Sequence, residues 1–151
     1  MKKVVSMLLS LVLLLSLSAC GNAGGGASGD SSGGSSNDVV KFAVVGPMTG
    51  ANAEYGLGFR QSAQIMADKW NAQGGVNGKQ IELVVYDDKQ SAEEAANVAE
   101  QIVANDDIVA VIGHHVSTCS MAAAPIYQDH GMLEVSPCSS HADFTAIGNW
   151  I

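Results

Sequence analysis

The residues best suited to binding chemistry are hydroxyl-bearing side chains that follow a glycine and two histidines. Ser117, Thr118 and Ser120 crowd the segment Gly113–Ser120, where we expect a helix to begin. Free backbone N–H groups and the helix dipole at such a terminus favour a bound anion, such as a carboxylate. Serine is also a preferred capping residue, so the pattern alone leaves an anion site and a simple N-cap open.

We expect two further loops to lie beside this segment, at the same edge of the predicted sheet. Ser136–His141 offers a second group of hydroxyls with exposed carbonyls. Gly46–Gly56 contains glycines that let the backbone bend sharply and could place Tyr55 at the mouth of the site. An ordinary strand-to-helix connection would have the same glycine pattern, so this alternative stays open. This loop has neither GxGxxG nor the GK[ST] of a phosphate loop, so no motif supports a nucleotide site.

The histidines and cysteines do not form a metal motif. No ligand pair has recognisable metal spacing, and we expect no metal and no cofactor. Most of the histidines are predicted to lie on the surface or in loops. In an oxidising compartment Cys119 and Cys138 are a possible disulfide pair, which the sequence leaves open. The histidines are His114, His115, His130 and His141.

Alternating strand and helix patterns position these loops. Four β-branched, apolar runs predict strands covered on both faces. The resulting strand and helix order implies a parallel sheet with right-handed crossovers, in which ligands bind beyond the carboxyl ends of the strands. We therefore predict an α/β fold, a parallel sheet flanked by helices. The expected strands are 39–45, 81–86, 108–112 and 132–135.

Three helices are expected between the strands. The first is expected to end at Gly74–Gly75, the second to start with a capping box at Ser91 and Glu94, and the third to span about 117–130. Gly131 should cap the third helix, and Pro125 predicts a kink or a late start there. The apolar face of the first helix comprises Phe59, Ala63, Met66, Ala67 and Trp70.

The N-terminus has the pattern of a cleaved secretion signal. Lys2 and Lys3 precede the apolar run Val4–Leu17, which is short for a membrane span. With Ser18 and Ala19 before Cys20, the segment resembles a bacterial lipoprotein signal, which implies that Cys20 is acylated and becomes the new N-terminus. We therefore expect an extracytoplasmic protein anchored to the cell membrane by lipid.

Three regions follow from this pattern: a signal peptide at 1–19, a linker at 20–37 and a folded region at 38–151. Twelve of the seventeen residues from 21 to 37 are glycine or serine, which gives a flexible coil with a reach of roughly 20–25 Å. The formal net charge is −8. This charge argues against nucleic acid as a partner and against electrostatic binding to anionic lipid.

Seven blocks in register resemble the leucine/isoleucine/valine-binding protein family, the solute receptors of branched-chain amino acid ABC transporters. The resemblance covers 39–151 and implies the type I periplasmic-binding-protein fold, of which this chain would be only the N-terminal part of lobe one. It also implies a small amino acid as ligand, an ABC permease as partner and no enzymatic activity. The blocks are 41–50, 54–56, 71–78, 86–88, 111–114, 124–127 and 136–137.

The resemblance also assigns candidate binding residues. In the family, a serine at the position of Ser117 and a hydroxyl residue at that of Ser140 hold the ligand's carboxylate. The carbonyl at the position of Cys138 and an acid from the second lobe hold its ammonium. Tyr55 matches an aromatic residue that covers the ligand, and His115 and Val116 would line the pocket wall.

The chain departs from the family at several points. Ser140 and Cys138 stand where threonine and alanine are common, and a family disulfide is absent because its positions are Gln90 and Val116 here. The family continues beyond Ile151, so we expect a truncated chain that lacks the ammonium-binding acid.

Two other functions are less consistent with the sequence. A ligand-sensing ectodomain would share the fold, but the lipoprotein signal argues against it. A secreted hydrolase using Ser117 would need a nucleophile motif such as GxSxG, which is missing.

Overall fold

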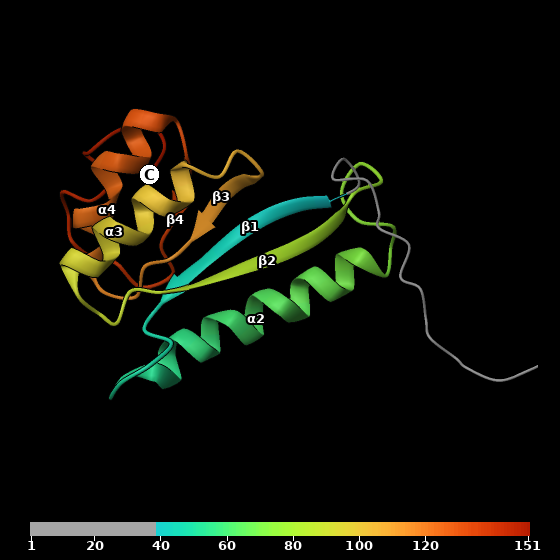
Figure 1. Cartoon of the computed structure of the whole chain (residues 1–151), viewed down its shortest axis with the longest axis horizontal. Helices are drawn as coiled ribbons and strands as arrows, with labels where there is room; N and C mark the ends of the chain where they lie inside the picture. Colours follow the sequence, from blue (N-terminus) through green and yellow to red (C-terminus); the bar gives the residue numbers. More distant parts are fainter. Residues whose placement is uncertain (1–38) are drawn as a thin grey trace, which may run out of the picture. The chain divides into compact units, whose positions relative to one another are not determined.

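The computed structural model describes residues 39–151, which form one α/β unit around a four-stranded sheet (Figure 1). The strands are β1 (Val39–Gly46), β2 (Gln80–Asp87), β3 (Ile108–Ile112) and β4 (Leu133–Val135). They lie in the order β2-β1-β3-β4, and every pairing is parallel. The expected strands and the parallel sheet are confirmed.

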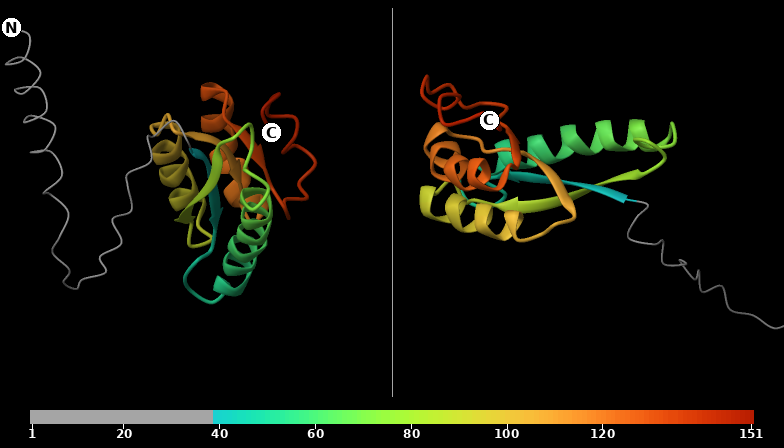
Figure 2. Two further views of the ribbon diagram at one scale, coloured as in Figure 1. Left: turned by 90° about the vertical axis from the view of Figure 1, so that its right-hand side faces the viewer. Right: turned by 90° about the horizontal axis from the view of Figure 1, so that it is seen from above.

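Three helices connect the strands and cover the two faces unequally. They are α2 (Ala53–Asn71), α3 (Ala92–Val103) and α4 (Ser117–His130). Figure 2 shows α2 on one face of the sheet, with α3 and α4 together on the other. All four strands are joined by crossovers, so their carboxyl ends point to one edge and the loops that begin α2, α3 and α4 gather there.

The core lies between the sheet and the α3/α4 layer. Val45 and Val111 of neighbouring strands are fully buried there, as are Ile102 of α3 and Tyr127 of α4. Burying such side chains contributes roughly 1.5–3 kcal/mol each. This face of the sheet is therefore the one that holds the fold together.

The face covered by α2 is packed less completely than the face covered by α3 and α4. Ala67 is buried, but Met66 is 49% exposed and Trp70 is 48% exposed. The reason is that α2 packs mainly on β1 and β2 and leaves the β3 side of this face without a helix.

The end of α2 also differs from the expectation. The helix ends at Asn71 rather than at the glycine pair. Gly75 instead closes the turn by donating its N–H to the Trp70 carbonyl at 2.9 Å, with φ of 77°. The Asn71 side chain then donates to the Ile81 carbonyl and accepts from the Ile81 N–H, which joins the helix end to β2.

The start of α3 shows half of the expected capping box. The Ser91 hydroxyl accepts the Glu94 N–H at 3.4 Å. The Glu94 carboxylate does not reach back to Ser91 but binds the Lys89 ammonium at 2.8 Å. The helix start is confirmed. The reciprocal hydrogen bond is wrong, because the Ser91 N–H donates to the Asp88 carbonyl at 2.8 Å instead.

Helix α4 spans the predicted residues. It is assigned without a break from Ser117 to His130, through Pro125, and Gly131 caps it in the left-handed conformation with φ of 65°. The late start considered for Pro125 does not occur.

The predicted signal peptide, Cys20 and the linker lie outside the described residues. In the part that the structure describes, no helix is both long enough and apolar enough to cross a membrane.

Two glycines of α2 provide a matched test of the packing at the helix start. A Cβ on Gly56 would lie 2.3 Å from the Pro47 carbonyl oxygen, whereas a Cβ on Gly58 would meet nothing within 4 Å. Gly56→Ala should therefore destabilise the fold by about 1–3 kcal/mol. Gly58→Ala should be neutral or stabilising by up to about 1 kcal/mol, from helix propensity. Urea denaturation of both variants checks this, and equal effects would contradict the close approach.

Candidate functional site

The N-terminus of α4 is not capped by a side chain. Val116 occupies the N-cap position, and no side-chain hydrogen bond closes it. The N–H groups of Cys119 and Ser120 bond to the Val116 carbonyl, whereas those of Ser117 and Thr118 have no acceptor within the described residues. The serine-cap alternative is therefore wrong, and two amides remain available to an anion.

The Ser117 hydroxyl faces the loop that follows β4. It accepts the backbone N–H of Ser140 at 3.2 Å. Ser117 is half-buried and Ser140 exposed. The fold thus brings two of the candidate residues together from the ends of β3 and β4, although they are far apart in the sequence.

Hydrogen bonds fix the loop after β4 against the loop after β3. The Ser136 hydroxyl donates to the His114 carbonyl at 2.9 Å and accepts the Ser139 N–H at 3.0 Å. The hydroxyls of Ser120 and Ser139 lie 2.6 Å apart. Cys138 is exposed within this loop.

Asp87 holds the loop after β1. Its carboxylate accepts the Met48 and Lys89 N–H groups at 2.9 Å and a hydrogen bond from the Thr49 hydroxyl. Partial burial would raise the pKa of Asp87, but the bonds from Thr49, Lys89 and Met48 outweigh it and lower the pKa below its ordinary value. Asp87 therefore stays ionised and orders the glycine-rich loop.

Tyr55 stacks on His115. The ring centroids are 4.3 Å apart with an angle of 17° between the planes, and Phe59 packs on the same imidazole at 5.7 Å. Tyr55 is 46% exposed, and the Nδ1 of His115 is buried without a hydrogen-bond partner in the described residues. Tyr55 thus lies at the edge of the site, with His115 as its support.

His114 lies in the loop after β3, within the expectation for most of the histidines, but its side chain is buried. Its Nδ1 lies 2.7 Å from an oxygen of Asp88, and both side chains are fully shielded from solvent. His130 and His141 are exposed, as expected. The sequence reasoning missed this pair, and the acid that directly follows the end of β2 was the available signal.

A second buried acid lies under α4. Glu134, in the centre of β4, is 1% exposed, and neither carboxyl oxygen has a hydrogen-bond partner in the described residues. Burial raises the pKa of Glu134 to about 8, against the lowering effect of the nearby Ser120 hydroxyl and the His114 backbone. The sequence does contain a signal for this burial, an acid between two apolar neighbours, which the sequence analysis did not use.

The two remaining cysteines are separate. Cys119 is buried, Cys138 is exposed, and both are free. Burial and the charge of Asp88 raise the pKa of the Cys119 thiol to about 11, despite a bond from Thr118, so it is unreactive at neutral pH. Among residues 39–151, no three His, Cys, Asp or Glu side chains gather where they could hold a metal ion.

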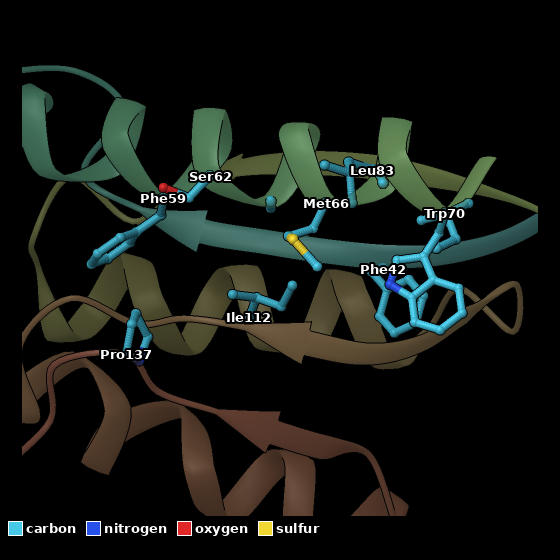
Figure 3. Close-up of a pocket in the computed structure, with 11 residues that line it drawn as sticks. Phe42, Phe59, Ser62, Met66, Trp70, Leu83, Ile112 and Pro137 are labelled. Atoms are coloured by element: carbon cyan, nitrogen blue, oxygen red, sulfur yellow. The ribbon is translucent and has the colours of Figure 1, made fainter. Parts of the chain in front are cut away.

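An apolar groove of about 370 Å³ lies elsewhere, between α2 and the sheet (Figure 3). Phe59 and Pro137 lie at one end of it, and Phe42 and Trp70 at the other. No charged side chain lines it, so it offers nothing to a carboxylate or an ammonium group. The polar site is at the strand ends instead.

Comparison with known proteins identifies the family. A family model described as "Periplasmic binding protein" matches residues 39–149, which include every strand and helix described above. The chain belongs to the periplasmic binding protein family. Its four-stranded parallel sheet and three helices match part of the type I fold of that family.

The relatives of this periplasmic binding protein include two amino-acid-binding proteins. The leucine-, isoleucine-, valine-, threonine- and alanine-binding protein of Pseudomonas aeruginosa is 39% identical over 111 residues, which are 74% of this chain and 30% of the relative. The Leu/Ile/Val-binding protein of Escherichia coli is 41% identical over 110 residues, 72% of this chain and 29% of the relative.

A solved structure of an amino-acid-binding protein is also similar to this chain. The branched-chain amino acid transporter substrate-binding protein LivJ of Streptococcus pneumoniae, in complex with isoleucine, matches with a TM-score of 0.68 and 32% identity, over 72% of this chain and 31% of the other. The chain spans about 30% of the length of the relatives it matches. These relatives are solute-binding proteins rather than enzymes, as expected from the sequence.

The buried pair of Asp88 and His114 can be tested against an exposed pair. Asp88→Ala leaves a buried imidazole without its partner and should lower the free energy of unfolding by about 3 kcal/mol. Asp107→Ala breaks the solvent-exposed 2.9 Å ion pair with Lys41 and should cost far less. Thermal and urea denaturation measure the free energy of unfolding of both variants. Equal losses would show that the buried contact stabilises the fold no more than the exposed ion pair.

Proposed function

We propose that this chain is part of an extracytoplasmic, lipid-anchored receptor that binds a small branched-chain amino acid and presents it to an ABC permease. The observation that carries the proposal is the uncapped start of α4. There the Ser117 hydroxyl accepts the backbone N–H of Ser140 at 3.2 Å. The neighbouring amides of Ser117 and Thr118 have no acceptor in the part of the chain that the structure describes. The names of the relatives support an aliphatic amino acid as the ligand.

The carboxylate of the ligand would bind at this helix start. The amides of Ser117 and Thr118, together with the Ser117 hydroxyl, supply donors at the positive end of the helix dipole. The Ser140 hydroxyl, on the exposed side of the opposing loop, would donate from the other direction. These are charge-assisted hydrogen bonds, which are stronger than neutral ones.

The ammonium group would bind the carbonyl of Cys138. This residue is exposed on the loop that Ser136 and Ser139 hold in place, so its backbone can reach a ligand beside α4. We propose that the balancing acid belongs to the part of the receptor that corresponds to the unmatched length of the relatives. Closure of two lobes on the ligand would then complete the site.

The side chain of the ligand would meet the aromatic edge. Tyr55 stacks on His115 next to Val116, so the three residues form a largely apolar wall beside the helix start. A wall of this kind suits an aliphatic side chain.

Ser117→Ala and Ser140→Ala test the carboxylate site. In the receptor that contains both lobes, each should weaken leucine binding by roughly 1.5–3 kcal/mol, the range for a lost hydrogen bond to a charged group. Isothermal titration calorimetry with leucine, isoleucine and valine measures the loss. Thr145→Ala removes an exposed hydroxyl outside the site and serves as the control. Unchanged affinity in both serine variants, with folding intact, would place the carboxylate elsewhere.

Cys20→Ser tests the anchor. Residues before Cys20 have the pattern of a lipoprotein signal, so the mature protein should begin with an acylated cysteine after cleavage behind Ala19. The variant should be released from the membrane fraction or remain unprocessed. Mass spectrometry of the mature N-terminus checks this, and an unmodified Cys20 in the wild type would refute the anchor.

A further inference from the structure

The turn between β2 and α3 holds two neighbouring residues in a strained backbone conformation. Lys89 and Gln90 have φ of 49° and 56°, in the left-handed region that residues other than glycine, asparagine and aspartate rarely adopt. The Lys89 N–H donates to a carboxylate oxygen of Asp87 at 2.9 Å. The Gln90 N–H donates to Oδ1 of the buried Asp88, also at 2.9 Å. Such a conformation persists only where its surroundings fix it, so the buried acid holds Gln90 in this turn.

The Gln90 side chain reaches the loop that follows β1. Its Oε1 accepts a hydrogen bond from Nδ2 of Asn52 at 2.6 Å, in a partly buried contact. Asn52 stands at the N-cap position of α2 but makes no capping hydrogen bond with its side chain, although asparagine is among the residues favoured for that role. The Asn52 amide therefore joins two loops instead of closing its own helix.

Asn52 is also bonded to the residue expected to cover the ligand. Its carbonyl accepts the Tyr55 N–H at 3.1 Å, in the first turn of α2. Tyr55 stacks on His115, with the ring centroids 4.3 Å apart. His115 follows His114, whose Nδ1 lies 2.7 Å from Oδ2 of Asp88. The two oxygens of one buried carboxylate thus lead by separate routes to the two rings of the same stack.

We propose that Gln90 is a positioning residue that holds Tyr55 against the ligand through Asn52. The inference rests on the proposed function only for its effect on affinity. Asp88 fixes the backbone of Gln90, the Gln90 amide fixes Asn52, and Asn52 fixes the start of the helix that carries Tyr55. The bond between the two amides is the partly exposed step of this route, so a substitution can release it without disturbing the buried carboxylate.

Without the Gln90 amide, packing alone would hold the Tyr55 ring. Tyr55 is 46% exposed, and its helix packs mainly on two strands. The ring would then occupy several orientations in the free receptor, and a ligand would have to order it again on binding. Ordering one side chain on binding costs enough to weaken affinity by roughly three- to tenfold. The carboxylate anchors at the start of α4 would be unaffected.

The first experiment follows the stack in the full chain by NMR. The ring protons of His115 lie against the Tyr55 ring and carry its ring-current shift. This shift should shrink in Gln90→Ala and in Asn52→Ala toward its value in Tyr55→Ala. Gln90→Glu keeps an oxygen that accepts from Asn52, so it should keep the shift. Gln64→Ala removes an exposed glutamine hydrogen bond elsewhere on α2 and serves as the matched control.

The second experiment measures leucine binding by calorimetry in the receptor that contains both lobes. Gln90→Ala should weaken binding by roughly three- to tenfold, while Gln90→Glu and Gln64→Ala should not. In a Tyr55→Ala background Gln90→Ala should have no further effect, because the residue through which it acts is gone. If the wild-type receptor binds no leucine, isoleucine or valine, the proposed function fails, while the NMR comparison still decides whether Gln90 positions Tyr55.

Two results would overturn the proposal. One is an unchanged His115 ring-current shift in Gln90→Ala with the fold intact. The other is a loss of leucine affinity in Gln90→Ala that is equally large in the Tyr55→Ala background, because the glutamine would then act through another group. If Gln90→Ala does not fold, Asn52→Ala breaks the same hydrogen bond from its other side, and the same two measurements decide.

Discussion

The contact between the buried side chains of Asp88 and His114 holds the functional edge of this domain together. β1 lies between β2 and β3 in the sheet, so a bond from the end of β2 to the end of β3 spans the end of the strand between them. The His114 carbonyl also accepts the Ser136 hydroxyl, which extends the connection to the loop after β4. Both side chains are removed from water, and loss of either would leave polar atoms desolvated. The loops at three strand ends therefore depend on one pair.

The sequence predicted the elements well because each one has a local cause. Runs of β-branched residues make strands, Ser91 starts α3, and Gly131 ends α4 in a conformation that favours glycine. Errors arose where a residue had a competing partner that local patterns do not reveal. Glu94 binds Lys89 rather than Ser91.

The site was only partly accessible from sequence. Hydroxyls at a predicted helix start indicated an anion site, and the fold does bring Ser117 to Ser140, while their role in binding stays a prediction. The burial of His114 and Glu134 was missed because it depends on which helix covers which strand. The acid that partners His114 is 26 positions away, and Glu134 lies on a strand that contacts α4.

The unequal cover of the sheet bears on how a ligand would be recognised. The proposed polar anchors belong to α4 and its adjoining loops, whose underside is the fully buried core shared with α3. Tyr55 belongs to α2, which packs on two strands and leaves Met66 and Trp70 half exposed. Segments with fewer buried contacts open at lower free energy, so Tyr55 is held less firmly than the anchors. The charged groups of an amino acid would then be fixed by the rigid side of the domain. Its variable side chain would meet the more adaptable side, an arrangement that suits a receptor for several aliphatic ligands.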